Sequence, residues 1–578
     1  MCGILMTAGV RTPFHHRLLR SLRKRGPDEI GFWSDPLVQM AHARLSIIGL
    51  DERGTEPLED ERHVLIYNGE IYNFHRLRDE LIAEGVPTSG ANDAEVLLHG
   101  WTHWGPAVLK KMHGFWSFII YDKQRKTISL VRDQLGVKPL YYWHSGTVVR
   151  AASLLKSILE VADEPRDLDY TAISEYVRYQ FTFGDKTFIK QIKKVMPGHI
   201  VEIDLTTGEK RVTCYEDIFA PNVTGVQSLT QEWLEQTREI INDCVLESTI
   251  SDTSFTTFCS GGIDSSLITR VAKPEVAYHC NYSDSECNET FYAKQVIETT
   301  AVRLLVVNAS EEFDLVSRCN DIIEDFDELT IGSVILPLDD LLAQVKRRYK
   351  VILTGTGGDE LFAGYVRYQL ALGECYQDSY KELFAKMQNL DVPGKRFELA
   401  HRKGNPELYK FYQPEVEQTF EAAFDECRLD RDDLAAMLRF DRRYFLAGLL
   451  NIDDKMCGRH SLESRPSFLH QRLVRHVQQL QPRDILPSNG DLKPVLRRVA
   501  DGLLPRSVIH RTDKMGFTTP IGVFVNHNAH RIREQITESK FRDFYDLRRM
   551  NFTAETKFSR EVFGLLMLDL WLNRYATA

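Results

Sequence analysis

The sequence changes its pattern of secondary structure part-way along its 578 residues. Up to about residue 210, short apolar, β-prone runs such as 64–67, 118–121 and 199–203 are separated by turns. Farther along, strand-like runs alternate with helical sequence, which is typical of a parallel sheet with helices on both faces. We therefore predict a β-rich layered domain followed by an α/β domain that is mainly helical from about residue 365.

A polar, turn-rich stretch between residues 217 and 228 separates the two patterns and contains Pro221 and Gly225. Single hydrophobic cores stop growing at roughly 250–300 residues, so a chain of this length is expected to divide. We predict domains at residues 2–212 and 228–578. In the second domain we expect helices over 230–247 and from residue 264, and strands at 255–259, 276–281, 304–307 and 351–354.

Charge and composition exclude several classes of protein. The net charge is −10 and no basic tract interrupts it, so a nucleic-acid partner is not expected. No apolar run approaches the roughly 18 residues of a membrane span, and no basic leader precedes the first apolar stretch. Ten cysteines lack CxxC or zinc-type spacing. These features predict a cytoplasmic protein.

Cys2 stands apart from the other cysteines because it follows Met1 directly. A small second residue permits removal of Met1, which makes cysteine the N-terminus. The α-amino group, with an unperturbed pKa of about 7.7–8.0, then serves as the base for the thiol of the same residue. A cysteine at this position is often incidental, so the interpretation depends on what accompanies it.

Four further segments accompany it: residues 25–28 (RGPD), 42–47 (HARLSI), 68–73 (NGEIYN) and 89–95 (SGANDAE). With Cys2, this set resembles the class II glutamine amidotransferases over about residues 2–210. The resemblance implies a four-layer αββα fold with an N-terminal cysteine nucleophile. It implies glutamine as a substrate and a thioester intermediate.

Carried over by position, the resemblance gives each residue a role. Cys2 attacks the side-chain amide of glutamine, and the Asn68 side chain and Gly69 N–H stabilise the oxyanion. Arg44 binds the α-carboxylate of glutamine, and Glu70 and Asp93 bind its α-ammonium. Asn68 also belongs to the glutamine site. The alternative for the charged residues is ordinary ion pairing at the surface.

In the second half, residues 255–259 form a predicted strand that runs into SGGIDSS, residues 260–266. A strand, a glycine-rich turn and a helix start together make an anion cradle, although this is not the P-loop pattern. The motif resembles the pyrophosphate loop of the ATP pyrophosphatase superfamily. That resemblance implies ATP, and Mg²⁺ bound by Asp264.

A second glycine-rich cluster, residues 355–365, follows another predicted strand. Alone it fits a turn and helix cap; paired with the first loop, it resembles the glutamine-hydrolysing asparagine synthetase family, with Asp359 as the other Mg²⁺ ligand. Lys493 matches a lysine that stabilises charge on pyrophosphate, and residues 511–517 with Pro520 match a late motif. The implied nucleotide contacts are Ser260, Gly261, Gly262, Asp264, Ser265, Ser266, Gly355, Thr356 and Gly357.

The family resemblance covers nearly the whole chain and implies an ATP-dependent ligase. A carboxylate, aspartate first, is adenylated and then attacked by ammonia released from glutamine, giving an amide, AMP and pyrophosphate. The chemistry implies a protected passage for ammonia, since protonation in water removes its nucleophilic lone pair. Related synthetases are often dimers, so a homodimer is one candidate assembly.

Three departures from the family pattern leave the acceptor open. Thr356 replaces a common acidic residue that can deprotonate ammonia, His470 replaces an aspartate within the altered segment 462–470, and Leu154 replaces a glutamate after Ser153. They fit neutral drift, or another acceptor such as a uronic acid or antibiotic precursor. A cyclase that closes a ring and a non-enzymatic regulator are also conceivable. The intact glutaminase residues argue against the former, and the intact phosphate loop argues against the latter.

Overall fold

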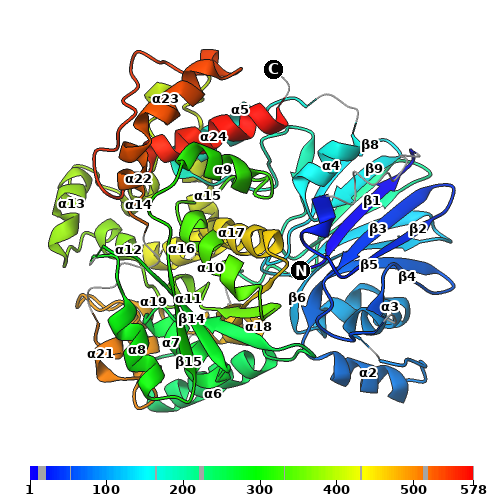
Figure 1. The fold of residues 1–578 in the computed structure, drawn as a ribbon. Helices are drawn as coiled ribbons and strands as arrows, with labels where there is room; N and C mark the ends of the chain where they lie inside the picture. The colour runs from blue at the N-terminus through cyan, green and yellow to red at the C-terminus, as the bar shows by residue number, and fades with distance from the viewer. Residues whose placement is uncertain are drawn as a thin grey trace.

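The computed structural model places the two halves of the chain side by side, with the antiparallel sheets of the first half packed against the α/β second half (Figure 1). It describes residues 1–10, 21–51, 54–90, 92–162, 166–220, 227–284, 286–330, 332–429, 432–511 and 519–576. We call residues up to 220 the N-terminal half and those from 227 the C-terminal half. Half of the predicted linker, residues 221–226, lies outside the described residues.

The described part of the N-terminal half contains two six-stranded antiparallel sheets, ordered β10-β8-β9-β1-β3-β2 and β12-β11-β7-β6-β5-β4. Helices α2 (Phe74–Ala83) and α3 (Asp93–Trp104) lie on the second sheet, and α4 (Leu155–Val161) and α5 (Tyr170–Tyr179) on the first. The strands are β1 (Gly3–Ala8), β2 (Glu29–Ser34), β3 (Val38–Arg44), β4 (Leu58–Glu59), β5 (His63–Ile71), β6 (Gly114–Asp122), β7 (Thr127–Arg132), β8 (Tyr141–Ser145), β9 (Val148–Ala152), β10 (Ile192–Lys194), β11 (His199–Asp204) and β12 (Lys210–Cys214).

Alternation along the strands explains why these sheets stack. In β1, Ile4 and Met6 enter the core between the sheets, while Leu5 faces the core that contains α4 and α5. In β6, Ile119 faces the inter-sheet core and Phe118 faces α3, where its ring meets Trp101 edge-on. A strand buried on both faces in this way needs a layer on each side. The predicted αββα arrangement is confirmed.

The C-terminal half is built on a parallel sheet with the order β15-β14-β13-β16-β17. Its strands are β13 (Phe255–Phe258), β14 (Val276–Asn281), β15 (Arg303–Asn308), β16 (Val351–Thr354) and β17 (Glu463–Pro466). Helices α6 (Gln231–Glu247), α7 (Ile263–Ala272) and α8 (Thr290–Glu298) share a core with one face, and α9 (Leu315–Ile323) and α10 (Ile335–Val345) with the other. The predicted parallel sheet is confirmed.

Beyond residue 365 the chain is mainly helical, as expected, but it also contributes the edge strand β17. The longest of these helices are α17 (Leu446–Arg459) and the C-terminal α24 (Glu561–Tyr575). The others are α11 (Gly358–Leu361), α12 (Val366–Ala371), α13 (Lys381–Met387), α14 (Pro393–His401), α15 (Val416–Cys427), α16 (Asp433–Phe440), α18 (Gln471–Val477), α19 (Pro482–Ile485), α20 (Pro494–Ala500), α21 (Arg506–Ile509), α22 (Ile521–His527) and α23 (Ala529–Glu538).

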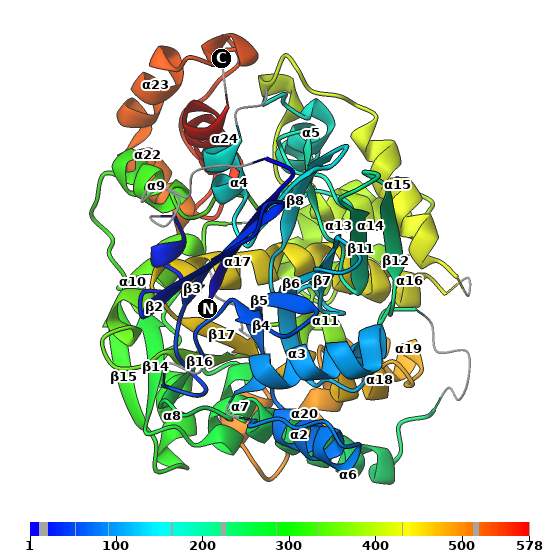
Figure 2. The ribbon, with the colours of Figure 1, turned by 90° about the vertical axis from the view of Figure 1, so that its right-hand side faces the viewer.

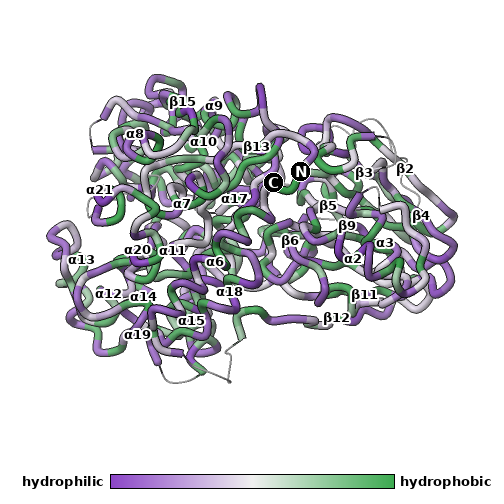
Figure 3. The backbone as a smooth tube through the Cα atoms, turned by 90° about the horizontal axis from the view of Figure 1, so that it is seen from below, coloured by the Kyte–Doolittle hydropathy of each residue, from purple (hydrophilic) through white to green (hydrophobic). Residues whose placement is uncertain are grey.

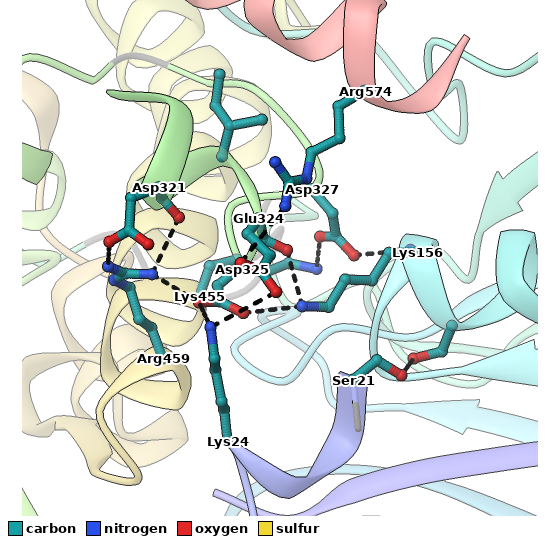
Figure 4. A network of polar contacts seen from close by, with 12 residues as sticks. Ser21, Lys24, Lys156, Asp321, Glu324, Asp325, Asp327, Lys455, Arg459 and Arg574 are labelled. Carbon is teal, nitrogen blue, oxygen red and sulfur yellow. Dashed lines mark hydrogen bonds and ion pairs between the residues drawn. The ribbon is translucent and has the colours of Figure 1, made fainter. Parts of the chain in front are cut away.

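The halves are joined by apolar and polar contacts. Helix α24 lies beside α4 and α5 of the N-terminal half, where Trp571 packs on Phe188 (Figure 2). Hydrophilic residues are frequent on outlying segments such as α13 (Figure 3). At the interface, Asp325 accepts hydrogen bonds from Lys24 and Lys156 of the N-terminal half (Figure 4). Within the described residues, no helix is both long and apolar enough to cross a membrane.

Candidate active sites

Five of the six predicted glutaminase residues line a cavity of about 30 Å³ in the N-terminal half; the sixth, Asn68, is not among the lining residues. Cys2 comes directly before β1, Arg44 ends β3, and Gly69 and Glu70 lie on β5. Asp93 starts α3, where its neighbour Asn92 caps the helix by accepting from Glu95 N. Strand ends from both sheets and one helix start therefore converge on a single small cavity, and all five of these predicted residues line it.

Cys2 is half-buried, and its thiol sulfur lies 4.0 Å from the carbonyl oxygen of Leu45. Burial raises the pKa of this thiol, so the protein environment does not by itself produce a thiolate. With Met1 attached, the chain's amino group is at Met1, where it donates to the Leu462 carbonyl at 3.4 Å. The α-nitrogen of Cys2 can serve as a base only after Met1 is removed, because until then it is part of a peptide bond.

Asn68 is fully buried on β5, next to Gly69. Neither polar atom of its side-chain amide has a hydrogen-bond partner among the described residues. An unpaired buried amide costs about 1–3 kcal/mol, which makes an incoming acceptor oxygen favourable at this point. At Gly69 an added Cβ would lie 2.4 Å from the Phe115 carbonyl, so the close strand approach requires glycine here.

The three predicted charged ligands differ in their surroundings. The Arg44 guanidinium pairs with Glu29 at 3.0 Å and also donates to loop carbonyls, so it is held in place without substrate. Asp93 accepts from Tyr67 Oη at 2.9 Å and from Ile71 N at 3.0 Å. Burial raises the pKa of both Glu70 and Asp93. A bound ammonium would offset that burial and hold both as carboxylates.

Glu56 was missed in the sequence because no motif surrounds it. It lines the same cavity, and its carboxyl group accepts from Tyr67 N at 2.5 Å. Burial raises the pKa of Glu56 to about 8. The His42 imidazole, 3.6 Å away, acts in the opposite direction but has the smaller effect. Glu56 is therefore a neutral hydrogen-bonding group at pH 7 and supports the strand that carries Asn68.

The first glycine-rich loop of the C-terminal half joins β13 to α7. Ser260 and Ser265 hold it closed through their hydroxyls, 3.0 Å apart, and Gly262 N donates to Ser260 Oγ at 3.2 Å. Gly261 has φ +78°, and a Cβ there would lie 2.5 Å from that of Tyr292. Gly262 caps α7, whose first turn contains Asp264, Ser265 and Ser266. The predicted anion cradle thus has the expected strand–turn–helix form.

The second loop, between β16 and α11, packs directly on the first. A Cβ at Gly358 would lie 2.5 Å from Asp264 Oδ1, so this approach requires glycine. Lys493 lies between the loops, with its Nζ 2.5 Å from Asp264 and 2.8 Å from Asp359. It is 4% exposed, so it is not a solvated surface lysine, and its backbone has φ +54°.

Two cavities adjoin these loops. One, of about 300 Å³, is lined by Ser260, Asp264 and Ser265 and by the loop 355–357. The other, of about 750 Å³, contains Gly262, Lys493 and a set of basic side chains: Arg497, Arg498, Arg506 and Arg511. Asp359 lines both cavities, whereas Gly261 and Ser266 line neither. A space with acidic and basic groups on the same wall suits a polyphosphate with its cation.

The donor set fits Mg²⁺. Asp264 and Asp359 supply hard carboxylate oxygens from two facing loops, and both line the 300 Å³ cavity. In the structure these carboxylates contact the Lys493 ammonium, which shows that a positive charge is favoured between them. They are the residues that would hold the ion.

Each departure from the family pattern has a local partner in the structure. Thr356 Oγ1 donates to Asp453 at 2.6 Å. His470 Nε2 lies 2.7 Å from Glu247 of α6. The Ser153 hydroxyl accepts from Ile4 N, and Leu154 is buried in the core with α4.

The late motif lies largely outside the described residues, which exclude 512–518. Its first residue, Arg511, pairs with Glu289 at the edge of the larger cavity. Pro520 comes directly before α22.

Comparison with known proteins matches both halves to family models. A glutamine amidotransferase domain matches residues 1–215, and the asparagine synthase model matches residues 236–573, more than half of the chain. The chain belongs to the asparagine synthase family. Asparagine synthetase [glutamine-hydrolyzing] 1 of Bacillus subtilis is 30% identical, over 95% of this chain and 91% of that protein. Asparagine synthetase [glutamine-hydrolyzing] 3 of the same organism is 26% identical, over 86% and 82%.

A relative with a different name covers less of the chain. Amidase chyE of Penicillium rubens is 27% identical over 60% of this chain and 54% of that protein. The two family models together make this asparagine synthase family member a glutamine-dependent, ATP-dependent ligase that forms amides.

Proposed function

We propose that this asparagine synthase family member converts aspartate to asparagine, with glutamine as the nitrogen donor and ATP as the activating nucleotide. The observation that carries the proposal is that Lys493 joins the two glycine-rich loops in a chain whose other half gathers Cys2, Arg44 and Glu70 at one cavity. We assign glutamine hydrolysis to residues 2–212 and amide synthesis to residues 228–578.

In the glutaminase step, removal of Met1 frees the α-amine of Cys2, which takes the thiol proton as sulfur attacks the glutamine amide. Asn68 Nδ2 and Gly69 N–H are the proposed donors to the oxyanion. Arg44 orients the substrate through its α-carboxylate, while Glu70 and Asp93 bind the α-ammonium. Ammonia leaves, and water hydrolyses the resulting thioester on Cys2.

In the synthetase step, the loop at 260–266 binds the phosphates of ATP through its N–H groups and the start of α7. Lys493 stabilises negative charge that develops as pyrophosphate leaves, and Mg²⁺ held by Asp264 and Asp359 would supply further charge neutralisation. The carboxylate oxygen attacks the α-phosphorus, giving an acyl-adenylate. Ammonia then attacks its carbonyl carbon, and AMP leaves.

A second candidate keeps the reaction and changes the acceptor to another carboxylate, such as a uronic acid or an antibiotic precursor. It is favoured by Thr356, which replaces the common acidic residue at the nucleotide loop, and by the relative that is named an amidase.

The test measures AMP and pyrophosphate release from purified protein with glutamine, Mg-ATP and a panel of carboxylates that begins with aspartate. We expect aspartate-dependent AMP matched by asparagine. A Cys2→Ala variant is the control: it should lose activity with glutamine and retain activity with ammonium chloride. Glutamine hydrolysis without aspartate-dependent AMP would reject asparagine as the product and favour the second candidate.

A further inference from the structure

Asp453, on helix α17, lies where the nucleotide cavity meets the interior between the two halves. It lines the 300 Å³ cavity together with Thr354 and Thr356. It also lines a separate cavity of about 10 Å³, whose other walls include Met1 of the N-terminal half and Ser464 of β17. Asp453 therefore lies on the side of the nucleotide cavity that is nearer to the N-terminus and Cys2.

The contacts of Asp453 differ from those of the acids on the nucleotide cavity that pair with cations. Asp264 and Asp359 contact the Lys493 ammonium, and Glu289 pairs with Arg511. The contacts of Asp453 are to hydroxyls, led by the 2.6 Å hydrogen bond from Thr356.

Glu360 also contacts a hydroxyl, since it accepts from Tyr365 Oη at 2.5 Å, but unlike Asp453 it does not line the small cavity beside Met1. His279 Nδ1 lies 2.9 Å from the Cys259 carbonyl oxygen. An acid that contacts hydroxyls keeps its capacity to accept a proton, whereas one that contacts an ammonium is held ionised.

Amide formation requires such an acceptor. When ammonia attacks the acyl-adenylate, a C–N bond forms and the nitrogen carries a positive charge. The nitrogen must lose one proton before the C–O bond to AMP breaks and the neutral amide forms. Threonine at position 356 cannot accept that proton at neutral pH, since a hydroxyl has no accessible basic form.

We propose that Asp453 is the proton acceptor for the attacking nitrogen, so that a carboxylate on α17 does what an acidic residue at position 356 would otherwise do. The inference rests on the proposed function, because it concerns the ammonia step of that reaction. Thr356 becomes a positioning residue: its hydroxyl holds the Asp453 carboxylate at the edge of the nucleotide cavity. Thr354 Oγ1, 3.3 Å from Thr356 Oγ1, extends the same hydrogen-bonded row toward Ser464.

The electrostatic surroundings of Asp453 suit this role. Burial raises the pKa of Asp453 to about 6, the hydrogen bond from Thr356 opposes that rise, and the neighbouring carboxylate of Asp454 adds to it. Cys457, one turn along α17, is another ionisable group near Asp453, and burial raises its own pKa so that it stays neutral. Met1 lines the same small cavity as Asp453. A base with this pKa is ionised at pH 7 and more basic than an ordinary aspartate.

The experiment separates the two half-reactions in the full-length protein. Aspartate-dependent ATP–pyrophosphate exchange reports adenylation, and asparagine formed from ammonium chloride reports the proton-transfer step. We expect Asp453→Asn to retain exchange and glutaminase activity and to lose amide formation by about 10²- to 10⁴-fold. Asp453→Glu, which keeps the carboxylate, should retain measurable amide formation.

Two further variants distinguish a chemical role from a structural one. Thr356→Glu combined with Asp453→Asn returns a carboxylate to the same edge of the cavity and should recover part of the lost amide formation. Thr356→Val removes the hydroxyl that stabilises the Asp453 carboxylate, so the acidic limb of the pH profile for amide formation, near pH 6 in the unmodified protein, should move to higher pH.

Each outcome decides the matter. Amide formation retained in Asp453→Asn overturns the inference and leaves the proposed function intact. No asparagine from the unmodified protein rejects the proposed function, and the inference with it. If Asp453→Asn loses exchange as well, recovery in the double variant supports the inference and absence of recovery overturns it.

Discussion

Arg25 and Asp454 form a buried salt bridge, with 2.6 Å between Nη1 and Oδ2, that links the N-terminal half to helix α17. The same guanidinium donates from Nε to the Cys2 carbonyl at 3.0 Å. Asp454 is the sequence neighbour of Asp453, which contacts Thr356 in the nucleotide loop. Arg25 therefore holds the backbone of Cys2, the proposed nucleophile. Through Asp454 and its neighbour Asp453, it is also connected to the nucleotide loop at Thr356.

Replacing Arg25 with glutamine should impair the glutamine-dependent reaction more than the ammonia-dependent one, because the Cys2 carbonyl loses its donor while the nucleotide loops keep their contacts. The variant also leaves Asp454 buried and unpaired, which should lower the free energy of unfolding by about 3–5 kcal/mol. The measurements are asparagine formation with each nitrogen source and chemical unfolding. Arg25→Gln with Asp454→Asn should recover stability without recovering glutamine use; equal loss with both nitrogen sources would contradict the linking role.

Replacing Asn68 with alanine should reduce glutamine hydrolysis by about 10²- to 10³-fold, since one oxyanion donor is lost. Stability should fall little or rise, because the buried amide has no partner among the described residues to lose. Glutaminase kinetics and thermal unfolding check both statements. A marked loss of stability with little loss of rate would show that the amide has a structural role instead.

The elements that the sequence predicted are those whose residues show a local preference for strand or helix. Residues 118–121 were predicted as a strand because the run is apolar and β-prone, and in the structure its successive side chains enter two different cores. Strand β17 was not predicted, because Glu463 and Arg465 are polar. Besides pairing with each other, they pair with Lys138 and Glu70 of the other half. No window of sequence contains both members of the pairs that join the two halves.

The same argument applies to the sites. Residues within motifs, such as the loop at 260–266, were found because a turn and helix start are contiguous in the chain. Asp453 belongs to no motif, and its partner Thr356 lies 97 positions away. Glu56 reaches the glutaminase cavity only because β4 and β5 are paired. The sequence therefore predicts the glycine-rich binding loops. Groups such as Asp453 and Glu56 reach the sites through contacts between distant parts of the chain, and these contacts have no signature in a short stretch of sequence.

His470 stands where the family pattern has an aspartate, and its neighbours suit a histidine. Replacing it with aspartate should therefore destabilise the protein. The His470 ring lies between Glu247 and His113 of the other half, and an aspartate there would face the Glu247 carboxylate. Although burial opposes it, hydrogen bonds from His113 and His470 lower the pKa of Glu247, so Glu247 stays charged. We expect His470→Asp to lower the unfolding free energy by about 1–3 kcal/mol. Adding Glu247→Gln should restore part of it, and thermal unfolding of the single and double variants gives the comparison.

The interface network in Figure 4 predicts a pH dependence of stability that centres on Asp325. Burial alone would raise the pKa of Asp325, but Lys156 and Lys24 lower it to about 2. Because this is below the unfolded value of about 3.9, the native state gains stability above pH 4 and loses it as the pH falls toward 2. The difference corresponds to about 2–3 kcal/mol at neutral pH.

Asp325→Asn should therefore lower the urea midpoint at pH 7 and reduce the additional loss between pH 4 and pH 3. Asp325 and Asp321 both pair with Arg459, but the Asp321 side chain is 63% exposed, so Asp321 is the matched control. Asp321→Asn should change stability by less than about 1 kcal/mol at either pH, since water screens an exposed pair. Equal effects of the two substitutions would mean that burial at this interface does not strengthen its ion pairs, and the acid sensitivity would have to arise from other carboxylates.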